Sequence, residues 1–134
     1  MSDSRHAAVL RRVLAAARTV YQELGWGWRE EVYREALARE LAPLHVACEV
    51  AQPIWYRGAP LSHVSVRWDM VVEGIVLVEL KAVKTALPLS GQRQVQRYMS
   101  NHAHSTHYAA IAINFPAQPR ASVQHHITFQ QNEA

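Results

Sequence analysis

Three ionisable residues, Asp69, Glu79 and Lys81, lie in segments whose other side chains are mostly apolar. The run Val76 to Leu80 is typical of a buried strand, in which Glu79 and Lys81 would project from the same face. Burying a carboxylate and an ammonium costs several kcal/mol unless a partner compensates their charges. A divalent metal ion and a phosphate group are suitable partners. The first hypothesis is therefore phosphate chemistry assisted by a metal.

The position of Asp69 relative to Glu79 depends on the turn between them. A two-residue loop would place the two side chains on opposite faces of the hairpin. A three-residue loop, Val72-Glu73-Gly74, with a left-handed glycine in a bulge would place them on the same face. Because a glycine stands where the longer loop needs one, we expect Asp69, Glu79 and Lys81 to line one side of a sheet.

Glu30 is a further candidate, because it shares a helical stripe with apolar residues such as Tyr33 and Leu37. The pattern thus turns Glu30 toward the protein interior, although a first-turn carboxylate that only stabilises the helix N-terminus stays an alternative.

Glu30, Asp69 and Glu79 would supply hard oxygen ligands for Mg²⁺ or Mn²⁺. The metal would polarise a phosphodiester and activate a water molecule, and Lys81 would orient that water or offset charge on the transition state. A cluster of surface salt bridges on an edge strand is the structural alternative.

The hydrophobic pattern predicts three helices and five strands. We expect helices over residues 5–24, 28–44 and 89–101, and strands over residues 47–56, 64–71, 75–83, 107–115 and 121–129. This order, ααβββαββ, predicts an α/β fold with a sheet flanked by helices.

The third expected helix carries candidate nucleic-acid contacts. Arg93 and Arg97 are four residues apart and could follow a phosphate backbone, or they could form an ordinary solvated basic face. Gln94 and Tyr98 share another stripe of this helix, which could face the carboxylates.

The composition indicates an ordinary globular chain. With 134 residues, 49% of them hydrophobic and 19% charged, we expect one domain spanning residues 1–134. The apolar runs are too short for a membrane span and the N-terminus is polar, so we expect no membrane association and a cytoplasmic location. The single Cys48 excludes an internal disulfide and is expected to be a buried structural thiol. A net charge of +3 favours polyanionic partners only weakly.

Several motifs occur together in a specific order. They are Gly27-Trp28-Arg29-Glu30-Glu31-Val32-Tyr33, Arg67-Trp68-Asp69, Val78-Glu79-Leu80-Lys81-Ala82-Val83, Gln94 with Tyr98, and Ile113-Asn114-Phe115. The chain resembles, over roughly residues 10–116, the small bacterial GxxExxY proteins grouped in the PD-(D/E)xK nuclease superfamily.

The resemblance implies a restriction-endonuclease-like core with a mixed sheet. It also implies that Asp69 and Glu79 bind metal, that Lys81 is the catalytic lysine and that Glu30 is an additional acidic residue from the preceding helix. Gln94 would be the polar residue of the following helix, near the site or its DNA.

The sequence departs from the family pattern at two positions. Trp68 replaces the proline of the "PD" element, and Gly91 stands where a histidine is expected. The first departure leaves the metal chemistry intact, whereas the second removes any role for that histidine.

The leading hypothesis is a metal-dependent nuclease that hydrolyses phosphodiester bonds, with DNA as the expected substrate. The alternative is a nucleic-acid-binding or assembly module on the same fold without turnover, and a purely structural oligomerisation domain is a weaker third. We also expect a homodimer, because two-fold symmetry is a simple way to cut both strands of a duplex.

Overall fold

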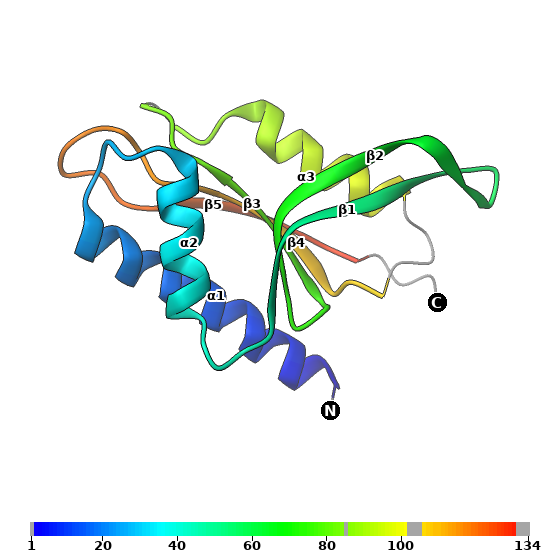
Figure 1. Cartoon of the computed structure of the whole chain (residues 1–134), viewed down its shortest axis with the longest axis horizontal. Coiled ribbons are helices and arrows are strands. Elements are labelled where there is room, and N and C mark those ends of the chain that lie inside the picture. Colours follow the sequence, from blue (N-terminus) through cyan, green and yellow to red (C-terminus); the bar gives the residue numbers. More distant parts are fainter. Residues whose placement is uncertain (1, 85, 102–105, 131–134) are drawn as a thin grey trace.

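The computed structural model describes residues 2–84, 86–101 and 106–130. Within these ranges, three helices and five strands follow one another in the predicted order ααβββαββ (Figure 1). Their bounds are α1 Ser2–Leu24, α2 Glu30–Glu40, β1 Val46–Tyr56, β2 Ala59–Val72, β3 Val76–Lys81, α3 Leu89–Asn101, β4 Ala109–Asn114 and β5 Gln124–Phe129.

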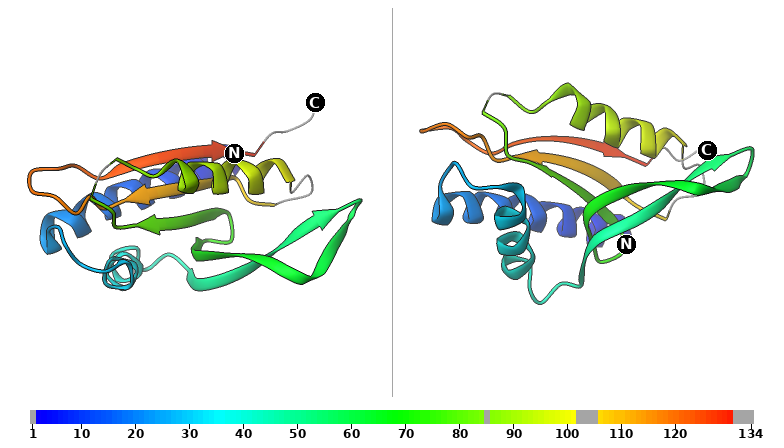
Figure 2. Two further views of the ribbon diagram at one scale, coloured as in Figure 1. Left: turned by 90° about the horizontal axis from the view of Figure 1, so that it is seen from above. Right: turned by 45° about the horizontal axis from the view of Figure 1, so that its top comes forward.

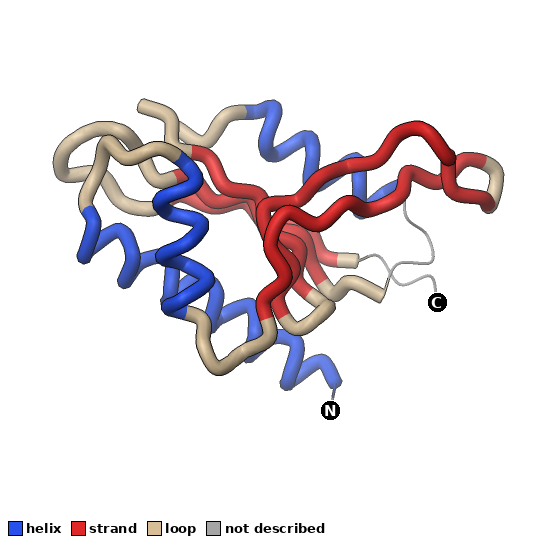
Figure 3. The backbone as a smooth tube through the Cα atoms, in the orientation of Figure 1, coloured by secondary structure: helices blue, strands red, loops and turns tan. Residues whose placement is uncertain are grey.

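The five strands form one mixed sheet in the order β1-β2-β3-β4-β5. β3 and β4 are parallel neighbours joined through α3, and the other three pairings are antiparallel. The predicted α/β class with a mixed sheet is therefore confirmed. β1 and β2 are the longest strands, and together they project from the sheet as an arm (Figure 3).

Helices cover both faces of the sheet (Figure 2). α1 and α2 enclose the larger apolar core, whose members on the sheet include Met70, Val78 and Ile111. α3 covers the opposite face, where a smaller cluster contains Trp68 and Val95. β3 and β4 are buried along almost their whole length because helices pack on both sides of them.

The connection between α1 and α2 is anchored by Tyr33. Its ring is fully buried and stacks on Phe115, with 4.3 Å between ring centroids and 2° between ring planes. Its hydroxyl donates a hydrogen bond of 2.7 Å to the carbonyl of Gly25. The tyrosine of the Gly-x-x-Glu-x-x-Tyr motif thus fixes the entry into α2, and with it the position of Glu30.

The loop between β2 and β3 has three residues, as predicted, but lies one residue later in the chain. Val72 pairs with Val76, which leaves Glu73, Gly74 and Ile75 in the loop. Gly74 adopts a left-handed conformation with φ of 67°. The Glu73 carboxylate accepts a hydrogen bond of 2.6 Å from the backbone of His45, which ties the loop to the start of β1. The shift of one residue at both ends of the loop changes the register by two residues, so Asp69 and Glu79 stay on the same face of the sheet.

Other boundaries differ from the prediction for local reasons. α2 ends at Glu40 instead of residue 44, because Pro43 cannot continue a helix. β2 begins at Ala59 because Arg57 and Gly58, both with positive φ, form a tight turn that lets the strands pair up to it.

The prediction of a buried thiol is wrong, because Cys48 is exposed in the edge strand β1. Among the helices of the described chain, none is long and apolar enough to cross a membrane.

Candidate active site

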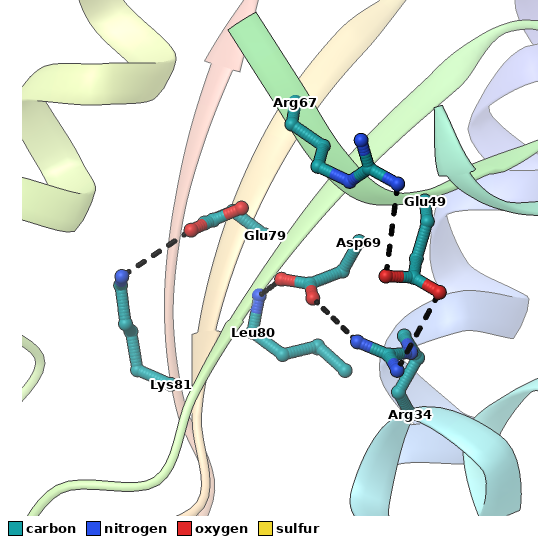
Figure 4. Close-up of polar contacts among 7 residues, drawn as sticks. All are labelled: Arg34, Glu49, Arg67, Asp69, Glu79, Leu80 and Lys81. Carbon is teal, nitrogen blue, oxygen red and sulfur yellow. Dashed lines mark hydrogen bonds and ion pairs between the residues drawn. The ribbon is translucent and has the colours of Figure 1, made fainter. Parts of the chain in front are cut away.

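The candidate site begins where β2 separates from β3. Backbone pairing between these strands ends at Met70 and Val78. Beyond that point the Asp69 Oδ2 atom accepts a hydrogen bond of 2.7 Å from the backbone N–H of Leu80 (Figure 4). The carboxylate therefore takes the place of a backbone acceptor at the fork between the strands. This bond fixes one Asp69 oxygen and allows the arm to diverge from the sheet.

Glu79 lies across the fork from Asp69 and is only 9% exposed. Burial raises the pKa of its carboxyl group to about 7, the negative charge of Asp69 also raises it, and Lys81 opposes the shift. The Lys81 Nζ atom lies 3.3 Å from the Glu79 Oε2 atom. Asp69, Glu79 and Lys81, which the sequence predicted to be neighbours, are thus close together.

Glu30 is the first residue of α2, and its carboxylate reaches the end of β3. Burial raises its pKa, Lys81 lowers it and Asp69 raises it, so all three groups share one electrostatic environment. A hydrogen bond from the backbone of Ala82 also acts on this carboxylate. The inward orientation predicted from the helical stripe is therefore observed, and Glu30 does more than stabilise its own helix.

A second ionic network flanks Asp69, and the sequence interpretation missed it. The Arg34 Nη1 atom lies 3.5 Å from Asp69 Oδ1, and Arg34 Nη2 lies 3.9 Å from Glu49 (Figure 4). Glu49 in turn lies 3.8 Å from Arg67. Arg34 follows Glu30 by four residues, so helical spacing could have placed it near the site. Glu49 and Arg67 meet it only through the pairing of β1 with β2.

A cavity of about 640 Å³ opens between the arm and α3. Glu79 lines it, together with one stripe of α3 and residues of β1 and β2. The lining residues are Ile54, Ser65, Val66, Arg67, Glu79, Ser90, Gln94, Arg97, Tyr98 and Asn101.

The nucleic-acid contacts predicted on α3 do not all face the cavity. Gln94, Arg97 and Tyr98 line the same cavity as Glu79, whereas Arg93 is exposed and is not part of its lining. Tyr98 is only 3% exposed, and burial raises its pKa to about 12. Its ring packs edge-on against that of Trp68, with 5.4 Å between ring centroids. Tyr98 therefore forms a wall of the cavity and leaves little of its own surface exposed.

The structure shows the surroundings of both residues that depart from the family pattern. Trp68, which replaces the proline beside Asp69, is fully buried in the cluster beneath α3. Gly91 is buried on α3 beside β3, and a Cβ atom there would make only ordinary van der Waals contacts, the nearest at 3.7 Å from Lys81 Cε. The expected histidine position is thus occupied by a glycine against which the Lys81 side chain packs.

The donor atoms of the site fit a hard divalent cation. Asp69 and Glu79 are adjacent, largely buried carboxylates, and their mutual repulsion would be relieved by such an ion. Within the described ranges, no group of three or more His, Cys, Asp or Glu side chains is already arranged to hold a metal. A metal would therefore need further oxygen ligands, from Glu30, water or a bound phosphate.

Comparison with known proteins agrees with this arrangement. Residues 7–126 match the sequence profile described as the PD-(D/E)XK nuclease superfamily, which covers most of the chain and all of the site described above. Comparison with curated proteins and with solved structures gives no significant match. The fold, the carboxylates and lysine at the fork, and the extent of the profile match lead to one conclusion: this chain belongs to the PD-(D/E)XK nuclease superfamily.

Proposed function

We propose that this protein is a metal-dependent nuclease that hydrolyses phosphodiester bonds of DNA. The observation that carries the proposal is the convergence of Asp69, Glu79 and Lys81 at the fork between β2 and β3, with Glu79 lining a cavity. Membership of a nuclease superfamily supports the same reaction class.

In this proposal Asp69 and Glu79 hold Mg²⁺ or Mn²⁺, and Glu30 contributes a further oxygen. When bound, the metal would polarise the scissile phosphate and lower the pKa of the attacking water. Glu79, with its pKa of about 7, would exist in both protonation states near neutrality until a cation favoured its charged form.

Lys81 has a distinct role in the proposal. Its ammonium lies 3.3 Å from Glu79, so it can donate a hydrogen bond to a water molecule or phosphate oxygen beside that carboxylate. There it would offset the negative charge that develops in the transition state. Gln94 and Arg97, on the facing wall of the cavity, would position the nucleic-acid strand.

One observation favours the non-catalytic alternative. Lys81 and Arg34 already pair with Glu79 and Asp69, so the site has charge balance without a metal. A binding or assembly module on the nuclease fold could retain these pairs for stability alone. The expected homodimer stays a prediction.

A cleavage assay separates the two functions. Labelled single-stranded and duplex DNA and RNA would be incubated with the wild-type protein in Mg²⁺ or Mn²⁺, and with Asp69→Asn, Glu79→Gln and Lys81→Met. We expect each substitution to slow cleavage by about 10²-fold or more. Glu35→Gln, an exposed position on α2, serves as the matched control. Unchanged cleavage in Asp69→Asn and Glu79→Gln would refute the proposal, and binding without cleavage would favour the alternative.

A further inference from the structure

The cavity beside Glu79 has the size of a small-ligand site. Its volume of about 640 Å³ lies within the range of roughly 300–1,000 Å³ that is typical of such pockets. It can hold part of one unpaired strand but is too small to receive a double helix. A phosphodiester that enters this cavity to reach Glu79 would therefore belong to an unpaired segment of nucleic acid.

Two hydrogen bonds join the C-terminal end of α3 to β1 beside the cavity. The Asn101 side chain accepts a hydrogen bond from the backbone N–H of Trp55 and donates one to the Trp55 carbonyl, both at 2.9 Å. The amide thus pairs with β1 as a neighbouring strand would. Nearer the middle of the helix, the Tyr98 hydroxyl donates a longer hydrogen bond of 3.4 Å to Gln52 of the same strand. We call the Asn101–Trp55 pairing the clasp.

Opposite walls of the cavity carry chemistry suited to one strand. Arg67 projects from β2 and Arg97 from α3, and both are charged groups that can bind phosphate. Ile54 and Val66 provide apolar surface on the arm side, against which a base can pack. Glu49 lies 3.8 Å from Arg67, but the Arg67 side chain is still 67% exposed. Arg67 therefore stays accessible to a ligand.

We propose that the protein acts on the free ends of single-stranded DNA, which enter the cavity and stop at the clasp. This inference rests on the proposed nuclease function and specifies its substrate. A nucleic-acid strand without an end that runs along α3 would have to pass between this helix and the arm, where the clasp joins the two elements. The geometry therefore selects for a strand terminus near Glu79.

The test compares a circular single-stranded DNA with the same molecule linearised at one site. Both cleavage in Mn²⁺ and equilibrium binding in a chelating buffer would be measured, at low salt. We expect the linear form to be cut and bound at least tenfold better than the circle. Asn101→Ala, which opens the clasp, should reduce this preference to less than threefold, while Ser100→Ala, an exposed neighbour, should preserve it.

The outcomes separate this inference from the proposed function. Equal cleavage of circle and linear form by the wild type would overturn end selection and leave nuclease activity established. Preferential binding of the linear form without cleavage would support end selection and count against the nuclease proposal. Equal binding of the two forms without cleavage, or binding of neither, would overturn the inference as well. A preference that survives Asn101→Ala would contradict the role of the clasp.

Discussion

The two faces of the sheet differ in what they bury. Beneath α1 and α2 lies an extensive apolar core in which residues such as Val13 and Leu37 are fully buried. Beneath α3 the apolar cluster is smaller, and the space beside it is the cavity that Glu79 and Gln94 line. The α3 face is therefore less extensively packed and leaves the candidate site accessible. The stability of the fold depends mainly on the opposite face.

The candidate site is surrounded by residues of helices from both faces of the sheet. Glu30 and Arg34 approach it from α2, whereas Lys81 packs against Gly91 of α3. Asp69 connects the two sides, because its two oxygens contact the backbone of β3 and the guanidinium of Arg34. In the proposed function, the apolar core would hold the charged groups in place and the open face would admit the substrate.

The largest predicted effect is the loss of unfolding free energy when a buried valine is replaced by alanine, compared between the two faces of the sheet. Val13→Ala in α1 and Val95→Ala in α3 remove the same atoms from fully buried positions. We expect Val13→Ala to cost about 2–3 kcal/mol of unfolding free energy and Val95→Ala about 1–2, because Val95 belongs to the smaller cluster, whose member Tyr98 lines the cavity and can relax more easily. Urea denaturation measures both. An equal or larger loss for Val95→Ala would contradict the proposed division between the faces.

The second prediction concerns pH and Glu79. Its pKa is about 7 in the folded protein and about 4.5 when unperturbed, so between these values the folded state holds a proton that the unfolded state has lost. Unfolding free energy should therefore fall by about 2–3 kcal/mol as the pH rises from 4.5 to above 7. The raised pKa of Glu30 acts in the same direction.

Glu79→Gln should remove most of this pH dependence in metal-free buffer, whereas the exposed Glu35→Gln should leave it intact. Urea denaturation at a series of pH values would measure the slope. If Glu79→Gln keeps the wild-type slope, Glu79 is not the buried acid described here.

The smallest predicted effect concerns Arg34. Its guanidinium, 3.5 Å from Asp69 Oδ1, repels a cation approaching the same carboxylate. Arg34→Gln should tighten Mn²⁺ binding about three- to tenfold, corresponding to roughly 1 kcal/mol of charge repulsion. Isothermal titration calorimetry measures it, with the exposed Arg39→Gln on the same helix as control. Weaker Mn²⁺ binding in Arg34→Gln would show instead that Arg34 positions Asp69.

Local spacing is sufficient to predict that Asp69, Glu79 and Lys81 lie close together. Glu79 and Lys81 are two apart in one strand, and the length of the loop before β3 sets their relation to Asp69. In the same way, the helical stripe that Glu30 shares with Tyr33 predicts that Glu30 points toward the protein interior. These features depend on periodicity within one element or one hairpin, which a sequence displays directly.

The rest of the site depends on how elements pack. Arg34 meets Glu49 and Arg67 only because β1 and β2 leave the sheet together as an arm. Cys48 is exposed because it lies on β1, an edge strand that has a neighbouring strand on one side only. Arg93 and Arg97 looked equivalent in sequence, yet only Arg97 lines the cavity. No local pattern contains this information.

The central claim is that Asp69 and Glu79 form a metal site, and Mn²⁺ binding tests it most directly. Calorimetric titration would compare the wild type with Asp69→Ala, with Glu35→Gln as control, in the absence and presence of a single-stranded oligonucleotide with non-hydrolysable linkages. We predict saturable binding to the wild type and the control, weakened at least tenfold in Asp69→Ala. Equal affinity in wild type and Asp69→Ala, or no saturable binding to the wild type even with the oligonucleotide, would contradict the claim.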